Sequence, residues 1–479
     1  MKKSGGTRDI WLYGMGNLGV SAMSQAVVTF FMFFGTAVLG FSGRSMGALF
    51  SVSVLWDAVT DPLSGMISDR YPGGRLGRRK PFLLLATVPA VACFLLMWCF
   101  PYERVGGGFL YLALFMLLFQ TATTFFYTPY AAMGLELCRG LKQTKLQSIR
   151  SLFSMLGSAM PMLVIGLLQL IQGREDVRYL PKTYALLGLI LGALSLLSLA
   201  VLFALREGGA VPEAGEKATS GRAVFGDFFR ELRNWEFRSV LIGYTLILTA
   251  SSIITGMGMH IFTYVFELGT GQMFLLLAEL FGFIVLSQPF WVNLSKKYEK
   301  RKLLRIGLYV TVAGCLMILL SYFLAENLQL PLLLTLTPAL VTTGVGIGST
   351  YPIPYAIVAE SISQRNTASV LGCMTFVFKL AQAVAVLLSG WMLDFSGFAS
   401  ANTGAWTDSG RQKLLVLFGA TLVILLLLAA KALAVKAGNA GQAAARPGRM
   451  RKLSKRRRNT KGPLGLPKRK KNAEGIGNT

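Results

Sequence analysis

The amino-acid sequence predicts an all-α membrane protein with twelve transmembrane helices arranged in two six-helix halves. Of its 479 residues, 53% are hydrophobic and only 15% are charged, and the mean hydropathy is +0.55. Soluble domains are about 25% charged. Apolar runs of about 20 residues recur roughly twelve times, and each is long enough to cross a hydrocarbon core about 30 Å thick. The runs are continuously apolar rather than alternating, which favours helices over a β-barrel.

These runs give the expected helices in chain order. The first six are expected at 10–37, 44–68, 81–100, 108–136, 146–172 and 183–205. The second six are expected at 236–266, 271–294, 303–324, 331–360, 366–392 and 412–436. Residues 1–9 are polar and the first run is full length, so no cleavable leader is expected before it. Glycines and prolines interrupt the 331–360 run, which is typical of helices that bend.

The chain divides near its middle, at its longest polar stretch. Six apolar runs lie on each side of that stretch, which predicts two halves that rock about a site between them. We therefore expect a first half over 1–205, a cytoplasmic linker over 206–235, a second half over 236–437 and a basic, disordered tail over 438–479.

The formal net charge of +26 reflects topology more than nucleic-acid binding. Basic residues gather in every second loop, as at 78–80 and 296–297. Positive loops stay in the cytoplasm, so we expect a plasma (inner) membrane protein with both termini cytoplasmic. The tail holds basic runs at 455–458 and 468–471 and no aromatic residue that would stack on a base. Attachment to anionic lipid and a solvated tail without a specific task both remain open.

Two acids, Asp57 and Asp61, lie inside the second apolar run. A carboxylate in hydrocarbon costs from about 3 kcal/mol upward, so such residues usually mark an ion or proton path. Their spacing of four residues puts both on one helix face, about 6 Å apart along the axis. With Thr60 beside them, they predict a site for a small monovalent cation. The alternative is a structural salt-bridged pair.

Lys379 places a third charge inside an apolar run, more than a dozen residues from Arg365. Two carboxylates and one ammonium leave a net charge of minus one, which a single monovalent cation cancels. An empty site would hold an uncompensated buried charge, and this disfavours crossing without the ion. The charge balance predicts coupling to Na⁺ or H⁺ rather than to a divalent metal.

The loop after the second run carries a charged motif that predicts a gate. Gly65-x-x-x-Asp69-Arg70 is followed by Gly77-Arg78-Arg79-Lys80. Asp69 is placed to accept hydrogen bonds from arginines of the loop or of a neighbouring helix end, as a lock that breaks when the halves rock. The candidate gating residues are Asp69, Arg70, Arg78, Arg79, Glu136 at the end of the fourth run and Glu360 at the end of the tenth.

This loop resembles that of the major facilitator superfamily. Together with Trp56-Asp57-x-x-Thr60-Asp61-Pro62, Thr128-Pro129-Tyr130 and Phe378-Lys379, it resembles the glycoside–pentoside–hexuronide:cation symporter family over residues 10 to 436. The resemblance implies the major facilitator fold and symport with Na⁺, H⁺ or Li⁺. It implies a cation site made of Asp57, Thr60, Asp61 and Thr124, with Thr60 standing where a family member has asparagine.

The same resemblance implies substrate and coupling roles for Ser21, Tyr127, Ala131, Arg150 and Lys379. Ser21, Tyr127 and Ala131 replace two acids and a tryptophan that hold the galactosyl group in a galactoside-transporting member, whereas the arginine is kept as Arg150. A sugar or glycoside is the expected substrate. An organic anion, a lysolipid and a proton-driven exporter are the alternatives. Arg150 either meets an acidic substrate or pairs with Glu136, and both interpretations stay open.

Other classes of function are disfavoured. An enzyme would need a nucleophile–base pair or a metal cluster, and one histidine (His260) with five scattered cysteines provides neither. We expect no cofactor and no metal beyond the monovalent coupling cation. The expected partners are a small-molecule substrate, that cation and membrane lipid, without nucleic acid.

Overall fold

The computed structural model describes residues 6–74, 76–99, 108–137, 141–173, 177–205, 230, 232–351, 353–354, 357, 367–398 and 408–434. The described residues belong to one compact unit, Met1–Ala434. The predicted linker is outside the described residues from 206 to 229 and at 231, and the predicted tail lies wholly outside them.

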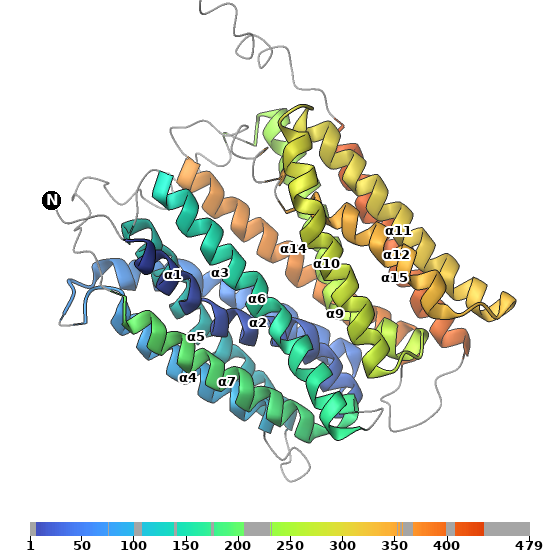
Figure 1. The fold of residues 1–479 in the computed structure, drawn as a ribbon, viewed down its shortest axis with the longest axis horizontal. Coiled ribbons are helices and arrows are strands. Elements are labelled where there is room, and N and C mark those ends of the chain that lie inside the picture. Colours follow the sequence, from blue (N-terminus) through green and yellow to red (C-terminus); the bar gives the residue numbers. More distant parts are fainter. Residues whose placement is uncertain are drawn as a thin grey trace, which may run out of the picture. The chain divides into compact units, whose positions relative to one another are not determined.

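The described part of this unit is built from helices (Figure 1). Before the linker these are α1 (Thr7–Gly16), α2 (Leu18–Phe33), the π-helical turn η1 (Phe34–Val38), α3 (Gly43–Arg70), α4 (Lys80–Cys99), α5 (Gly108–Leu137), α6 (Leu141–Gln172), the 3-10 turn η3 (Val177–Tyr179) and α7 (Pro181–Phe203). After it come α9 (Trp235–His260), the π-helical turn η4 (Ile261–Val265), α10 (Thr270–Ser295), α11 (Lys300–Leu328), α12 (Leu332–Gly348), α14 (Thr367–Phe395) and α15 (Asp408–Ala432).

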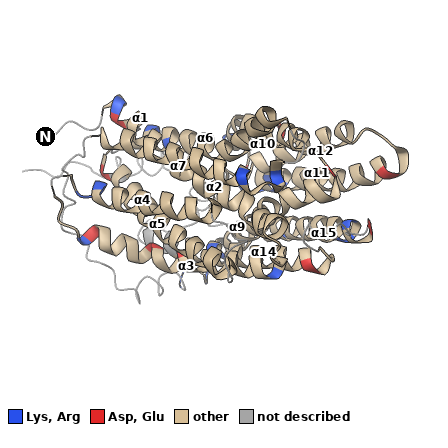
Figure 2. Cartoon of the chain, turned by 90° about the horizontal axis from the view of Figure 1, so that it is seen from below, with Lys and Arg blue, Asp and Glu red and all other residues tan. Residues whose placement is uncertain are grey.

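These helices confirm the predicted all-α membrane architecture. Among the described residues, ten helical segments are long and apolar enough to cross a membrane. α3 has 28 residues and carries several charges, which lowers its hydropathy without shortening it. Figure 2 shows that uncharged residues make up most of the ribbon.

The tenth predicted helix differs from expectation. α12 has 17 residues and ends at Gly348, instead of running through 331–360. The chain turns at Ser349 and Thr350, and several of the residues beyond Tyr351 lie outside the described part. Gly346 and Gly348 lie so close to α11 and α10 that a Cβ there would be 2.5 Å or less from Thr311 or Ser287. Helices in membranes use small residues for such close approach.

Local signals explain where several helices begin and end. The Ser42 side chain caps α3 by accepting a hydrogen bond from the Ser45 amide, 3.2 Å away. Pro181 begins α7, where its missing N–H is not needed. α11 ends at Leu328, directly before Gln329, and α14 ends at Phe395, two residues before Gly397; Gln329 and Gly397 both have positive φ.

Among the described residues, the two sets of helices meet mainly where α3 packs on α14, α2 on α9 and α6 on α10 (Figure 1). One end of the unit holds the basic loops that contain Arg78, Arg79, Lys296 and Lys297, and we call it the basic end. The other end, which holds the loops 39–42, 177–180 and 266–269, is called the opposite end. The α3–α14 pair brings together the acids and the lysine singled out in the sequence.

Candidate cation and substrate site

Lys379 of α14 bridges both intramembrane aspartates of α3. Its Nζ lies 2.5 Å from Asp57 Oδ2 and also donates to Asp61 Oδ2. The Asp57 and Lys379 side chains are 17% and 15% exposed, and the Asp61 side chain is 37% exposed. The cluster is therefore held largely away from solvent, with its Asp61 side the more open.

Two threonines complete the surroundings of the carboxylates. Thr124 of α5, which is 2% exposed, donates its hydroxyl hydrogen to Asp57 Oδ1. Thr60 is also buried, and its hydroxyl donates to the Trp56 carbonyl of its own helix, 3.1 Å away. That donation leaves lone pairs on the Thr60 oxygen. The four predicted cation residues and Lys379 are thus brought together by α3, α5 and α14.

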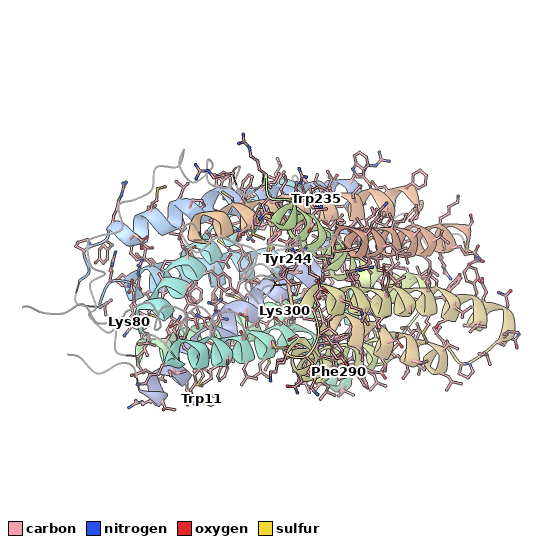
Figure 3. The ribbon with its side chains drawn as sticks, turned by 90° about the horizontal axis from the view of Figure 1, so that it is seen from above. Trp11, Lys80, Trp235, Tyr244, Phe290 and Lys300 are labelled. Carbon is pink, nitrogen blue, oxygen red and sulfur yellow. The ribbon has the colours of Figure 1, made fainter. Side chains whose placement is uncertain are left out.

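The arrangement has the chemistry of a monovalent cation site. Carboxylate and hydroxyl oxygens suit hard cations, and two carboxylates with one ammonium leave one negative charge. One monovalent cation or proton would cancel the negative charge that the ammonium leaves. Tyr244 of α9, labelled in Figure 3, packs edge-on against Phe378 with ring centroids 4.9 Å apart. This contact supports the helix that carries Lys379.

The predicted substrate residues form a hydroxyl-rich cluster between α2, α5 and α6. Ser21 Oγ lies 3.2 Å from Ser154 Oγ, and Ser24 Oγ lies 3.3 Å from the Tyr127 hydroxyl. Arg150 lies one helical turn before Ser154 on α6 and hydrogen-bonds Gln147. Tyr127 is three residues from Thr124 on α5, so one helix connects this cluster to the cation residues. Ala131 lies one turn further along α5 and is half-buried.

A cavity lies beside the cation cluster, between α2, α3, α9 and α14. It encloses about 1040 Å³, its open mouth included, and its polar lining includes Ser251, Ser252 and Thr255 of α9 and Gln382 of α14. A second cavity of about 1060 Å³, its open mouth included, lies on the far side of Thr255, which lines both. Its lining is almost entirely apolar and comes largely from α9, α10, α11, α12 and α15.

Arg79 is the centre of the predicted gating cluster at the basic end. Its Nη2 lies 2.7 Å from Glu136 Oε1 and 2.7 Å from Asp69 Oδ1, and Nη1 donates to Ser68. Burial acts to lower the pKa of the Arg79 guanidinium, but hydrogen bonds to Glu136 and Asp69 outweigh it and raise that pKa above its usual value. Arg78 joins the cluster through Asp69 O and Glu136.

This cluster ties α3, α4 and α5 to one another rather than to the second half. Arg70 is exposed at the end of α3, and Glu360 lies outside the described residues. Of the two partners left open for Arg150, Glu136 is engaged by Arg78 and Arg79. Within the described part of the chain, no ion pair joins it to Arg150.

Some polar residues at membrane depth and at the opposite end were not found by sequence reasoning. Glu279 stands inside the apolar helix α10 and is half-buried, a signal of the same kind as Asp57 that was present in the sequence. Arg178 is 4% exposed and donates to Thr263 Oγ1 at 2.6 Å and to Leu268 O at 2.9 Å. His260 lies buried with its Nε2 2.8 Å from Thr36 Oγ1.

A family model described as MFS/sugar transport protein matches residues 12–435. The chain belongs to this family. It is therefore a membrane transporter of the major facilitator type, which confirms both the predicted fold class and the expectation of a transporter rather than an enzyme.

Several named relatives align with most of this chain. It is 26% identical over 431 residues to the "Uncharacterized symporter YnaJ" of Bacillus subtilis, which covers 87% of this chain and 89% of the relative. It is 26% identical to the "Putative glycoside/cation symporter YagG" of Escherichia coli, covering 82% and 83%. It is 24% identical to the human "Sodium-dependent lysophosphatidylcholine symporter 1", covering 75% and 71%.

Solved structures agree on the fold. The nucleoside transporter NupG has a TM-score of 0.63 at 15% identity, covering 90% of this chain and all of that one. A bacterial homologue of the human lysosomal transporter Spinster has a TM-score of 0.65 at 14% identity, covering 90% and 98%.

Proposed function

We propose that this transporter is a symporter that couples entry of its substrate to a gradient of Na⁺ or H⁺. The observation that carries the proposal is the bridge from Lys379 on α14 to Asp57 and Asp61 on α3. The cation residues and their internal ammonium lie on different halves of the transporter. Whatever occupies the carboxylates therefore acts directly on the contact between the halves.

In the proposed cycle, the arriving cation and the Lys379 ammonium share the two carboxylates. With the cation bound, the charges of the three side chains and the ion sum to zero. The halves can then move, and the site can open to the other side of the membrane, without burying an uncompensated charge. Without the cation, one negative charge remains in a low-dielectric setting, where its cost is high. This difference links movement of the halves to occupancy of the cation site.

A sugar or glycoside is the substrate we favour. The hydroxyls of Ser21, Ser24, Tyr127 and Ser154 lie in one cluster, and hydroxyl groups both donate and accept hydrogen bonds as sugar hydroxyls require. The name of the relative YagG points the same way. Arg150, beside this cluster, suits a substrate that also carries a carboxylate.

A lysolipid is the second candidate, and one observation favours it. The apolar cavity adjoins the polar cavity at Thr255, so a polar head would lie next to Gln382 and a hydrocarbon chain would extend between α10, α11 and α12. Relatives named as lysophosphatidylcholine symporters support it.

We further propose that the basic end faces the cytoplasm of a plasma (inner) membrane, because positively charged loops remain on that side. On this assignment the opposite end is extracellular.

Purified protein in proteoliposomes tests the coupling. Cation binding is measured as the change in intrinsic tryptophan fluorescence or in the thermal midpoint on addition of NaCl, LiCl or choline chloride, at pH 6 and pH 8. Uptake of radiolabelled glycosides and of lysophosphatidylcholine is then driven by an imposed Na⁺ or H⁺ gradient. Coupled accumulation of one substrate is expected.

Asp57→Cys and Asp61→Cys should abolish accumulation at unchanged protein content. Ser53→Cys is the matched control, because Ser53 is buried one turn before Asp57 and donates to the Phe50 carbonyl of its own helix. Normal coupled accumulation in both aspartate variants would refute the proposed site.

A further inference from the structure

The contact between the halves at the opposite end includes a carboxylate that caps a helix of the other half. Asp394 Oδ1 accepts a hydrogen bond from the Gly43 amide at 2.8 Å, and Oδ2 accepts one from the Arg44 amide at 3.1 Å. Gly43 and Arg44 are the first two residues of α3, whereas Asp394 lies near the end of α14. The acid is only 16% exposed.

This contact completes the N-terminus of α3. The first four amides of a helix lack partners within the helix, and the helix dipole makes that end attractive to a negative charge. The Ser42 side chain accepts from the Ser45 amide, and the Ser42 carbonyl accepts the first regular bond of the helix from the Met46 amide. The amides of Gly43 and Arg44 donate to Asp394 instead. Hence these two amides at the start of α3 keep their partner only while α14 is in place.

The backbones also meet at this point at a distance that only glycine permits. A Cβ added to Gly390 of α14 would lie 2.2 Å from the Gly43 carbonyl oxygen. A Cβ on Gly43 would lie 2.6 Å from the Gly390 carbonyl oxygen, and one on Gly47 would lie 3.0 Å from the Gly390 Cα. Neither backbone can move aside without separating the helices.

Other contacts between the halves accompany it at the same end. They are the hydrogen bond between Thr36 and His260 and those from Arg178 to Thr263 and Leu268. By contrast, the Arg79 cluster at the basic end lies within the first half. The structure is thus closed at the opposite end.

We propose that Asp394 is the latch of this closure: it must release the N-terminus of α3 before the opposite end opens, and it sets the balance between the two states of the transporter. Calling this end extracellular rests on the proposed function, but the latch itself does not. The Arg44 side chain contributes less than its backbone, because it is 69% exposed although its Nε lies 3.2 Å from Asp394 Oδ2.

A cysteine placed in the polar cavity reports on the latch without any transport assay. Gln382 lines that cavity, twelve residues before Asp394 on α14 and so about 18 Å further from the opposite end. Gln382→Cys is introduced and its reaction with a membrane-impermeant maleimide is followed in intact cells and in inside-out vesicles. Protein without Gln382→Cys is the blank for the native cysteines.

Asp394→Asn should increase the rate of labelling from the opposite end by about tenfold, equivalent to about 1.4 kcal/mol. Gly390→Val should increase it at least as much, because the side chain keeps the helices apart. Arg44→Gln should have a small effect.

Two controls lie outside the contact. Asp408→Asn removes an 84% exposed carboxylate at the same end, and Gly282→Val adds a side chain where nothing lies within 4 Å. Both should label like the parent protein.

Equal labelling rates in Asp394→Asn, Gly390→Val and the parent protein would overturn the proposed latch, provided that thermal melting shows all three proteins to be folded. An effect of Arg44→Gln as large as that of Asp394→Asn would overturn the assignment to the helix cap. Faster labelling in inside-out vesicles instead of cells would support the latch and refute the proposed orientation. Loss of cation coupling in the aspartate variants of α3 is measured separately and has no bearing on these rates.

Discussion

Replacing Thr124 with valine removes one oxygen from the cation cluster while almost preserving its volume. The Thr124 hydroxyl donates to Asp57 Oδ1, and Thr124 is 2% exposed. Valine has the same branched shape, so little change in packing is expected, and the lost group is a hydrogen bond to a charged carboxylate.

The magnitude follows from that contact. Hydrogen bonds to charged groups contribute about 1.5–3 kcal/mol. Each 1.4 kcal/mol is a factor of ten in affinity. If Thr124 holds Asp57 in place for the ion or contributes its own oxygen to it, Thr124→Val should weaken apparent cation affinity by about 10- to 150-fold, with protein abundance unchanged.

The chain provides a matched control at the adjacent position. Thr123 is 3% exposed on the same helix, but its hydroxyl donates to the Gln120 carbonyl of α5. Sodium titration of tryptophan fluorescence should therefore give a normal midpoint for Thr123→Val and a much higher one for Thr124→Val. Equal midpoints for the two variants and the parent protein would refute the role assigned to Thr124.

Three further predictions concern other parts of the transporter. Lys379→Gln removes the ammonium between the two carboxylates, so protons should compete with the cation, and the apparent affinity for the cation should depend more steeply on pH. An unchanged pH profile in a sodium titration would show that Lys379 does not act electrostatically on the two carboxylates. Because Ser21 and Tyr127 stand where galactoside-binding acids are expected, melibiose should be a poor substrate, and strong uptake in cells lacking their own permease would show the mapping to be wrong. Arg79→Gln leaves Glu136 without its main partner and should lower the thermal midpoint by several degrees, since breaking a buried pair costs about 3–5 kcal/mol. The pKa of Arg79 is raised by folding, so its contribution is complete below its usual pKa and is lost only as pH rises through the higher folded value; the effect of Arg79→Gln on the midpoint should be the same at pH 5 and pH 9.

The sequence was sufficient for the fold class and for the components of the cation cluster. Hydropathy runs locate helices because every backbone polar group in hydrocarbon must be satisfied within the helix. Intramembrane charges are few, so Asp57, Asp61 and Lys379 stood out at once. The structure adds that Lys379 contacts both acids at the same time, which spacing along the chain cannot reveal across more than 300 residues.

The contacts at the opposite end were not predictable in the same way. Asp394 and Arg178 lie near the ends of helices, where charged residues are ordinary, and nothing in their local sequence names a partner. Their roles arise from the packing of α14 on α3 and of η3 on η4 and α10. Glu279, by contrast, carried the same signal as Asp57 and was overlooked. The 331–360 run passes through the turn at Ser349 and Thr350 because the residues on both sides of that turn are mostly apolar, and hydropathy averaged over a run does not register two polar residues.

The order in which the cation cluster is made has a consequence for biogenesis. Asp61 and Lys379 are 318 residues apart in the chain. At a synthesis rate of about 5–20 residues per second, α3 waits on the order of 15 to 60 s in the bilayer before the lysine leaves the ribosome. During that interval the nascent first half carries two carboxylates in hydrocarbon with the hydroxyls of Thr60 and Thr124 near them but without the ammonium of Lys379. Because buried carboxylates without a partner are costly, we expect a proton or an alkali cation to accompany α3 into the membrane. The yield of inserted protein should then depend on the salt and pH of the translation reaction as well as on its membranes.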